Sequence, residues 1–196
     1  CLLLSISAPV FAVEEEMHIS DAGLEFIARY EGFRSSPYYD GGSWYIGYGT
    51  ACDPADYPEE ITQEQAFELM RSKTDGFDQR LNRFLAKYGA VLTQNQFDAM
   101  ISLTYTLSSN WMTMDYSLGR YVVYGGYDEL GFVNSIGSWC HAGGRFYSRL
   151  AQRRIDEARL FLYGDYQGDW APQYVYVNFD ANGGSMESDV QYYALG

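Results

Sequence analysis

Basic residues are scarce in this chain. Its 196 residues include 13 Lys and Arg against 26 Asp and Glu, which gives a formal net charge of −13 at neutral pH. A nucleic-acid-binding surface needs a basic patch that neutralises phosphates, and the sequence contains none. The same charge repels an anionic polymer at long range, so such a ligand would have to be held by local contacts.

Histidine and cysteine are also rare. The only histidines are His18 and His141, and no Cys-x-x-Cys pair occurs, so the ligand spacing typical of a metal site is missing. We therefore expect no metal and no cofactor. Cys52 and Cys140 could form one disulfide in an oxidising compartment, and two free buried thiols are the alternative.

The apolar segment at the start of the chain is too short to span a bilayer. It covers 2–11 and leads into Val10-Phe11-Ala12, which has the small-x-small form of a signal-peptide cleavage site. We expect 1–12 to be an export signal that lacks its positively charged start, and 13–17 to be a linker. This predicts a secreted or cell-surface protein without stable membrane insertion. A buried N-terminal strand and an uncleaved, membrane-tethered form are the alternatives.

Aromatic residues, by contrast, are abundant. They make up 17% of the chain, and 19 residues are Tyr. Aromatic faces stack on sugars in carbohydrate-binding sites, but they also pack in protein cores, so composition alone does not decide between these roles. The apolar share of 47% and the charged share of 20% are typical of a soluble globular protein with one sizeable core.

A first helix carries an acidic residue in an unusual place. Ser20 can cap the helix, and its apolar stripe includes Leu24 and Ile27. The stripe continues to Glu31, and Gly32 can end the helix. Burial and the negative end of the helix dipole both disfavour ionisation of a carboxyl at this position. An ordinary surface glutamate would not be placed there.

The rest of the sequence predicts a mixture of helices and short strands. A glycine-rich aromatic segment over 37–50, with a turn at Asp40-Gly41-Gly42, predicts a β-hairpin. Capping boxes and apolar residues at helical spacing predict the remaining helices. These helices are expected at 62–87, 93–105, 118–127 and 145–163, and a strand is expected at 173–179.

Glu31 and Asp40 form an unequal pair of carboxyl groups. Glu31 faces inward at the end of a helix, whereas Asp40 lies in a polar turn nine residues further on. Glycoside hydrolysis uses this inequality, because one carboxyl must be protonated and the other ionised. The spacing alone is weak evidence, since an acidic chain contains many such pairs.

Three segments in order resemble one family. The first runs from Tyr30-Glu31-Gly32-Phe33-Arg34 through Tyr39-Asp40 to Tyr45-Ile46-Gly47-Tyr48-Gly49. The second is Leu92-Thr93-Gln94-Asn95-Gln96-Phe97-Asp98-Ala99, and the third comprises Leu150, Arg153-Arg154, Glu157 and Leu160-Phe161. Together they resemble the phage-type lysozymes, the endolysins of glycoside hydrolase family 24, over about 19–163.

The resemblance implies an α+β, lysozyme-like fold in which a small β-hairpin lobe and a larger helical lobe flank a cleft. It places the catalytic domain at 18–166. The implied activity is hydrolysis of the β-1,4 bond between N-acetylmuramic acid and N-acetylglucosamine in bacterial peptidoglycan. The expected protein is a secreted or cell-surface monomer of bacterial or prophage origin, with peptidoglycan as its partner.

Family roles carry over to several residues. Glu31 would be the general acid, and Asp40 would activate water or stabilise the transition state. Arg153 matches the arginine that pairs with the catalytic glutamate. Tyr45 stands where the family has a water-positioning threonine, and Thr50 replaces a histidine, so either hydroxyl could take over that task.

Other residues are expected near the substrate or mark departures from the family. We expect Trp44, Tyr48 and Arg153 to contact the substrate. The turn after Asp40 is one residue shorter than usual, and Thr106-Leu107-Ser108 replaces the usual Asn-x-Gly. These changes leave inverting stereochemistry open. They keep two alternatives in view: a catalytically attenuated peptidoglycan-binding surface protein, and a lytic transglycosylase that needs no water nucleophile.

The tail over 167–196 is expected to be either an added β-strand or the start of another module. Val177-Asn178-Phe179-Asp180-Ala181-Asn182-Gly183-Gly184 resembles the opening of a Listeria–Bacteroides surface repeat.

Overall fold

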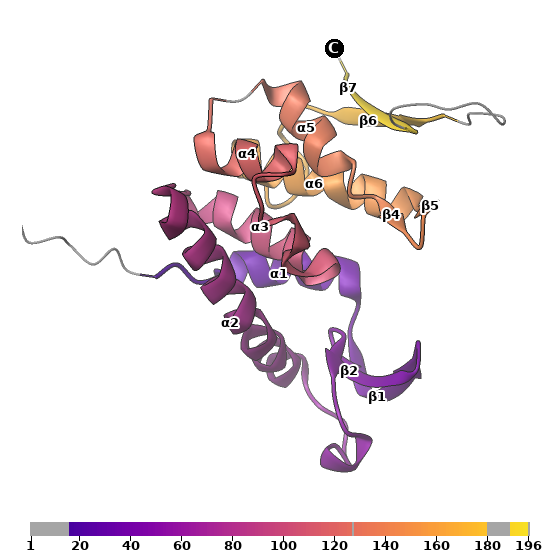
Figure 1. Ribbon diagram of the computed structural model, residues 1–196. Coiled ribbons are helices and arrows are strands. Elements are labelled where there is room, and N and C mark those ends of the chain that lie inside the picture. The colour runs from indigo at the N-terminus through magenta and orange to yellow at the C-terminus, as the bar shows by residue number, and fades with distance from the viewer. Residues whose placement is uncertain (1–15, 127, 180–188, 196) are drawn as a thin grey trace, which may run out of the picture.

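The structure, a computed structural model, describes residues 16–126, 128–179 and 189–195. A small antiparallel sheet lies at one end, a helical body at the other, and one long helix connects them (Figure 1). The expected α+β arrangement, a small β-hairpin lobe beside a larger helical lobe, is confirmed. The expected export signal and most of the linker fall outside the described residues, as does much of the proposed repeat opening. Within the described part, no helix has the length and apolar character needed to cross a membrane.

Helix α1, Asp21–Glu31, forms as its sequence predicts. The Ser20 side chain accepts a hydrogen bond from the Gly23 backbone N–H at 3.1 Å, which satisfies one of the unpaired donors of the first turn. Gly32 ends the helix with φ of 70°, a conformation that favours glycine. Glu31 is therefore the last helical residue, and its side chain is half-buried.

The small sheet consists of three antiparallel strands. They are β1, Arg34–Asp40, β2, Ser43–Gly47, and the short β3, Thr50–Ala51. Gly41 and Gly42 have φ of 53° and 92°, as a two-residue hairpin turn requires. A 3-10 turn, Pro54–Asp56, then leads toward the long helix. The predicted hairpin is thus confirmed, including its turn.

Helices α2, Gln63–Tyr88, and α3, Gln94–Leu107, both begin at capping boxes. At the first, the Thr62 backbone N–H donates to the Gln65 side chain at 2.8 Å, and the reverse bond from Gln65 N–H to Thr62 Oγ1 measures 3.3 Å. α2 connects the sheet to the helical body, where α3 packs against α1, α2 and α6.

The later helices differ in part from the expectation. α4, Ser117–Tyr124, forms as predicted, but α5, Glu129–Gly137, was not expected, because glycine at 131 and 137 weakens its helical pattern. α6, Ser148–Tyr163, starts later than predicted, since strands β4, His141–Ala142, and β5, Arg145–Phe146, form a small hairpin before it.

The end of α3 carries a departure that the sequence had already marked. Ser108 has φ of 58° and ψ of −170°, which is a backbone region used almost only by glycine. It begins a 3-10 turn, Ser108–Trp111. The serine in place of the usual glycine therefore sits in a strained conformation.

The tail forms a second hairpin. β6, Tyr174–Asn178, pairs with β7, Val190–Ala194, and the hairpin packs on α5. The Tyr192 hydroxyl donates to the Gly137 carbonyl at 3.0 Å, and a Cβ at Gly137 would lie 2.0 Å from the Tyr192 ring. Glycine at 137 thus permits the contact that docks the tail.

Candidate active site

Glu31 is held by an arginine from the last helix. Arg153 Nη1 donates to Glu31 Oε1 at 2.7 Å, which makes a charge-assisted hydrogen bond between α6 and the end of α1. The predicted pairing of these two residues is confirmed. The Arg153 side chain is only 5% exposed, whereas that of Glu31 is 23% exposed.

A buried polar network supports this arginine. Arg153 Nε donates to Glu157 Oε1 at 3.0 Å, and the same oxygen accepts from Ser102 Oγ at 2.7 Å. Arg154 Nη1 lies 2.9 Å from the other Glu157 oxygen. Burial lowers the pKa of Arg153, but Glu157 and Glu31 outweigh it, so that the pKa is raised above its ordinary value. Arg153 is therefore charged and fixed in place.

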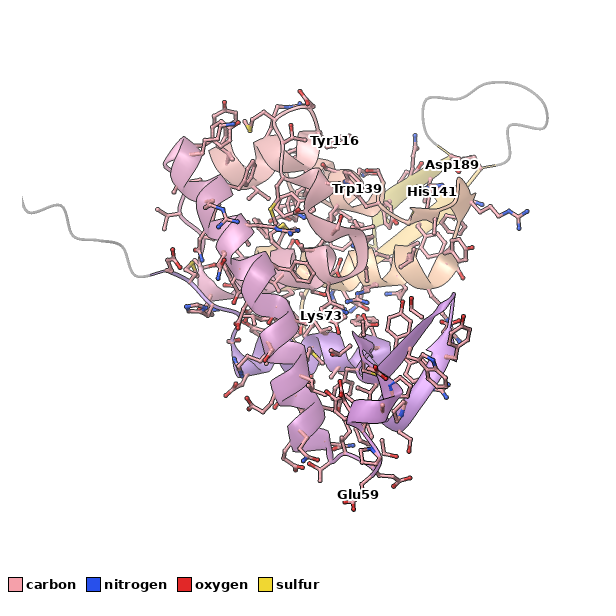
Figure 2. The ribbon with its side chains drawn as sticks, turned by 60° about the horizontal axis from the view of Figure 1, so that its bottom comes forward. Glu59, Lys73, Tyr116, Trp139, His141 and Asp189 are labelled. Carbon is pink, nitrogen blue, oxygen red and sulfur yellow. The ribbon has the colours of Figure 1, made fainter. Side chains whose placement is uncertain are left out.

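Two residues near Glu31 were not anticipated. Lys73 of α2 donates to the Gly49 carbonyl at 3.0 Å, and its Nζ lies 3.7 Å from the centre of the Tyr105 ring. The Tyr105 hydroxyl in turn donates to the Tyr48 carbonyl at 2.7 Å. Figure 2 shows Lys73 on α2, between the helical body and the sheet. Neither residue belongs to a motif, so only the fold reveals their place.

Gly49 lets the backbone of the sheet come close to the acid. A Cβ at this position would lie 3.9 Å from Glu31 Oε2 and 4.0 Å from the Tyr38 hydroxyl, and the residue has φ of 81°. Burial raises the pKa of Tyr38, Arg34 lowers it, and Glu31 raises it further. Tyr38 thus stays neutral and faces Glu31.

The register of the β1–β2 hairpin decides which residues share a face with Tyr38. Tyr38 pairs with Tyr45, and Asp40 pairs with Ser43. Because alternate residues of a strand share a face, and paired residues do too, Tyr38, Asp40 and Tyr45 lie on one face. The rings of Tyr38 and Tyr45 are 5.9 Å apart. Since Tyr38 faces Glu31, this face of the hairpin also presents Asp40 and Tyr45 toward Glu31.

The comparisons agree with this arrangement. The family profile described as phage lysozyme matches residues 28–157, which includes both α1's Glu31 and α6's Arg153. The chain belongs to the phage lysozyme family. Among curated relatives, the endolysin of Bacillus phage B103 is 30% identical over 152 residues, covering 76% of this chain and 56% of the relative. The chain thus spans little more than half of that relative's length.

Solved structures of phage lysozyme-type folds are also similar. An endolysin from the Escherichia coli O157:H7 phage FAHEc1 aligns with a TM-score of 0.64 and 28% identity, covering 76% of this chain and 96% of the other. The muramidase domain of SpmX from Asticaccaulis excentricus aligns with a TM-score of 0.61 and 29% identity, covering 74% and 99%. The lysozyme-like part accounts for most of the chain in both alignments.

In this member of the phage lysozyme family, Trp44 lies on the face of the hairpin that is turned away from Glu31. It pairs with Tyr39 in the register, and their rings meet edge-to-face at 5.4 Å between centres. Tyr39 is 63% exposed and Trp44 is 40% exposed. By strand alternation, this exposed pair occupies the face opposite Asp40. The structure therefore does not bring Trp44 together with Glu31 and Asp40.

Tyr48 and Thr50 are turned into the protein. Tyr48 is 6% exposed, and its ring packs between Phe33 and Phe67 at 5.6 and 5.1 Å. It is therefore a residue of the hydrophobic core. Thr50 Oγ1 is buried and has no hydrogen-bond partner among the described residues. Of the two hydroxyls considered for water positioning, only that of Tyr45 is on the same face as Asp40.

Cys52 and Cys140 do not form a disulfide with each other. Cys52 follows the small sheet and is half-buried, whereas Cys140 is fully buried in the helical body. Burial raises the pKa of both thiols. Of the two alternatives open at the sequence level, the structure contains free thiols.

Possible metal ligands and a cavity lie elsewhere. His18, Asp75 and Asp78 place ligand atoms within 4.8 Å of one another, but His18 and Asp75 are exposed, and such groups are common without an ion. Burial raises the pKa of Asp78 to about 6.

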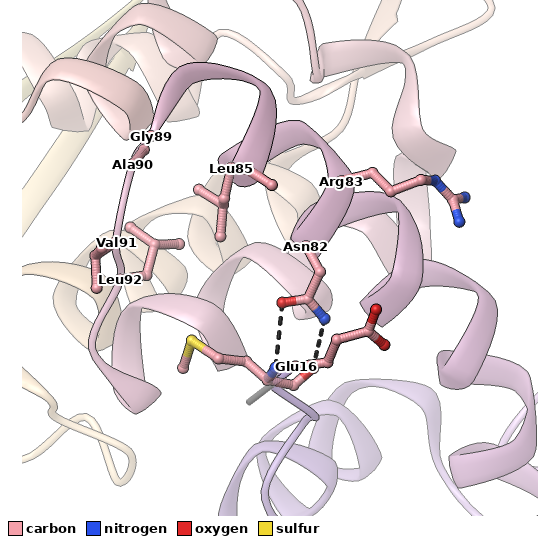
Figure 3. Close-up of a pocket in the computed structure, with 10 residues that line it drawn as sticks. Glu16, Asn82, Arg83, Leu85, Gly89, Ala90, Val91 and Leu92 are labelled. Atoms are coloured by element: carbon pink, nitrogen blue, oxygen red, sulfur yellow. Dashed lines mark hydrogen bonds between the residues drawn. The ribbon is translucent and has the colours of Figure 1, made fainter. Parts of the chain in front are cut away.

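A cavity of 790 Å³ beside Asn82 is bounded by the N-terminal segment and the end of α2 (Figure 3). None of the predicted site residues lines it.

Proposed function

We propose that this protein is a muramidase that hydrolyses the β-1,4 bond between N-acetylmuramic acid and N-acetylglucosamine in bacterial peptidoglycan. The observation that carries the proposal is the ion pair of Glu31 with the buried Arg153, set against a hairpin face that carries Asp40. Membership of the phage lysozyme family supports it, as do relatives named endolysin and muramidase.

The two carboxyl groups divide the reaction between them. Glu31, fixed by Arg153, transfers a proton to the oxygen of the leaving sugar as the glycosidic bond breaks. Asp40, which is exposed, stabilises the developing positive charge or accepts a proton from the attacking water.

Tyr45 is the side chain we assign to the attacking water. It lies on the face of Asp40 and is half-buried beside Tyr38. Its hydroxyl can accept and donate one hydrogen bond, which is what orienting a water molecule requires. Thr50 is less suited, because its hydroxyl is buried.

The substrate also bears on location and assembly. Peptidoglycan lies outside the cytoplasmic membrane, which agrees with the proposed export signal at 1–12. We propose that the protein acts at the cell wall as a monomer. A lytic transglycosylase is the second candidate, because burial of the Thr50 hydroxyl leaves the water site with a single candidate side chain.

Digestion of purified peptidoglycan, with mass spectrometry of the fragments, tests the proposal. The chain is compared with Glu31→Gln, which keeps the size of the side chain and removes its acidic proton. We expect reducing disaccharide fragments from the wild type and none from the variant. Anhydro sugar ends would identify a transglycosylase instead. Polymer that stays intact while retaining the protein would overturn the enzyme assignment in favour of a wall-binding surface protein.

A further inference from the structure

One cluster of possible metal ligands lies outside the candidate active site. It consists of His18, in the segment that precedes α1, and of Asp75 and Asp78 on α2. One ligand atom from each residue lies within 4.8 Å of the other two. Local spacing in the sequence does not reveal this cluster, because His18 is far along the chain from the two aspartates and only the fold brings them together.

Asp78 distinguishes this cluster from a chance gathering of surface groups. Its side chain is only 1% exposed, and its Oδ1 is buried with no hydrogen-bond partner among the described residues. The other oxygen, Oδ2, accepts a hydrogen bond from the Ile19 backbone N–H at 3.1 Å and lies 3.4 Å from His18 Nδ1. The carboxylate therefore points toward the segment that carries His18. A buried carboxylate oxygen without a partner is unfavourable, and a bound cation would satisfy it.

The segment that carries His18 is held against the helices by its backbone. Asn82 forms two hydrogen bonds with the Met17 backbone, at 3.2 and 2.7 Å (Figure 3). Gln94 Nε2 donates to the His18 carbonyl at 2.9 Å. The imidazole therefore extends from a fixed point of the backbone, and its Nδ1 already lies beside Asp78. Two of the three ligands are thus in place before any ion binds.

The distances and the donor types favour zinc. Ligand atoms of a tetrahedral zinc ion lie about 3.4 Å apart, because the bonds to nitrogen and oxygen are about 2.0–2.2 Å long. His18 Nδ1 and Asp78 Oδ2 have that separation. Asp75 is exposed, so its carboxylate can rotate to close the remaining distance. One imidazole and two carboxylates supply three ligands, and water would complete four-coordination.

The charges around the cluster also favour a cation. Asp75 precedes Asp78 by three residues, so the two carboxylates share one side of α2. Arg71, one turn earlier, is engaged by Asp21 and by the Ile19 carbonyl. In the part of the chain that the structure describes, no lysine or arginine forms an ion pair with either carboxylate of the cluster.

We propose that His18, Asp75 and Asp78 form a binding site for a zinc ion, which joins the segment before α1 to α2. The inference is independent of the proposed muramidase activity. The ligands come from segments that are far apart in the unfolded chain, so an ion bound here stabilises the folded state. Because Ser20 in the same segment caps α1, the ion also secures the start of the helix that ends at Glu31.

Isothermal titration calorimetry with zinc chloride tests the site, on the chain after treatment with EDTA and dialysis at pH 7.5. We expect one ion per chain, with a Kd in the micromolar range because only three side chains bind it. Ca²⁺ and Mg²⁺ should bind at least about ten-fold more weakly, since both prefer oxygen ligands to an imidazole. Zinc that binds no more tightly than Ca²⁺ would mean that the acidic surface merely attracts cations, and would overturn the proposal.

His18→Gln and Asp75→Asn are the decisive variants, because both side chains are exposed and their replacement should leave the chain folded. Each should weaken zinc binding by about ten-fold or more. His141→Gln is the matched control, since it removes the other histidine, which pairs with Asp189 at 2.8 Å. It should leave zinc binding unchanged. Unaltered binding in His18→Gln, or an equal loss in His141→Gln, would show that the ion binds elsewhere.

Thermal unfolding gives a second measurement that does not depend on activity. Zinc at about 100 times its Kd should raise the unfolding midpoint of the wild type by about 5–10 °C, because the ion binds the folded state alone. The same zinc concentration should leave the midpoint of His18→Gln nearly unchanged. If zinc did not raise the midpoint of the wild type, the proposed site would be wrong, whatever the result of peptidoglycan digestion.

Discussion

The two carboxyl groups that we assign to the reaction are held in opposite ways. Glu31 ends a capped helix and bonds to Arg153, which is itself bound by Glu157 in a buried network. Asp40 ends a strand beside two glycines, is exposed, and its side chain makes no hydrogen bond or ion pair with the described residues.

This difference matches what each group has to do. A proton donor must be aimed at one oxygen atom, so a rigid, buried support is useful. A carboxylate that acts through its charge and through water needs solvent, and an exposed turn supplies it. The consequence is that the support of Glu31 is part of the stability of the fold, whereas the surroundings of Asp40 are not. Substitutions in the network that supports Glu31 should therefore lower the free energy of unfolding, whereas a substitution at Asp40 should lower the rate and leave stability nearly unchanged.

The largest effect is expected from Arg153→Met. The change removes the cation bound to both Glu31 and Glu157, and the buried Glu157 is left with Arg154 and Ser102. Loss of one partner of a buried ion pair lowers the free energy of unfolding by about 3–5 kcal/mol. Urea denaturation at neutral pH measures this loss.

Arg71→Met is the matched control for that experiment. Arg71 pairs with Asp21 at the surface, where the two side chains are 37% and 89% exposed. An exposed pair contributes about 1 kcal/mol or less, because solvent screens it. If the two variants lost equal stability, burial of the Arg153 network would not explain its contribution.

Asp40→Asn should lower the rate of hydrolysis and leave the stability nearly unchanged. We expect the rate of peptidoglycan hydrolysis to fall by about 100-fold, because the negative charge near the reacting centre is lost. The free energy of unfolding should change by less than about 0.5 kcal/mol, since the side chain is exposed. Turnover and urea unfolding are measured on the same preparation. A large loss of stability with little loss of rate would mean that Asp40 is a structural turn residue.

Local sequence signals account for the elements that frame Glu31. The Ser20 cap, the glycine after Glu31 and the capping boxes of α2 and α3 each act within a few residues, so the helix ends could be predicted from the sequence. The Glu31–Arg153 pair joins residues far apart in the chain. It was predicted only through the family resemblance, since no local rule connects them.

The remaining features depend on packing that the sequence does not display. Lys73 is one of several charged residues on a long helix, and its contact with Gly49 exists only because the sheet folds back onto α2. Trp44 was expected to contact the substrate, and the strand register places it on the face opposite Asp40, where a shift of one residue would exchange the two faces. The glycine at 137 weakened the helical pattern of α5, yet it is needed where Tyr192 docks.

Tyr45→Phe tests whether the Tyr45 hydroxyl, on the face of the hairpin that carries Asp40, orients the attacking water. Removal of the hydroxyl should slow hydrolysis by about ten-fold, because a single orienting hydrogen bond is lost while the ring contact with Tyr38 remains. Steady-state rates on peptidoglycan, with and without the change, measure the effect. An unchanged rate would direct attention to Thr50, whose hydroxyl would then have to leave its buried position to reach the water.

The smallest effect is expected from Trp44→Ala. Trp44 and Tyr39 form their exposed pair on the face opposite Asp40, so loss of the indole should change kcat and KM by less than about two-fold, even though aromatic rings are common sugar contacts. The same assay as for Tyr45→Phe gives the comparison, and the two residues are adjacent in one strand. A rise in KM of ten-fold or more for Trp44→Ala would mean that the substrate wraps around both faces of the hairpin. In that case the face carrying Asp40 would be only part of the binding surface. The comparison between the rigidly held Glu31 and the exposed Asp40 would then have to include the opposite face, with Tyr39 and Trp44, as a third region.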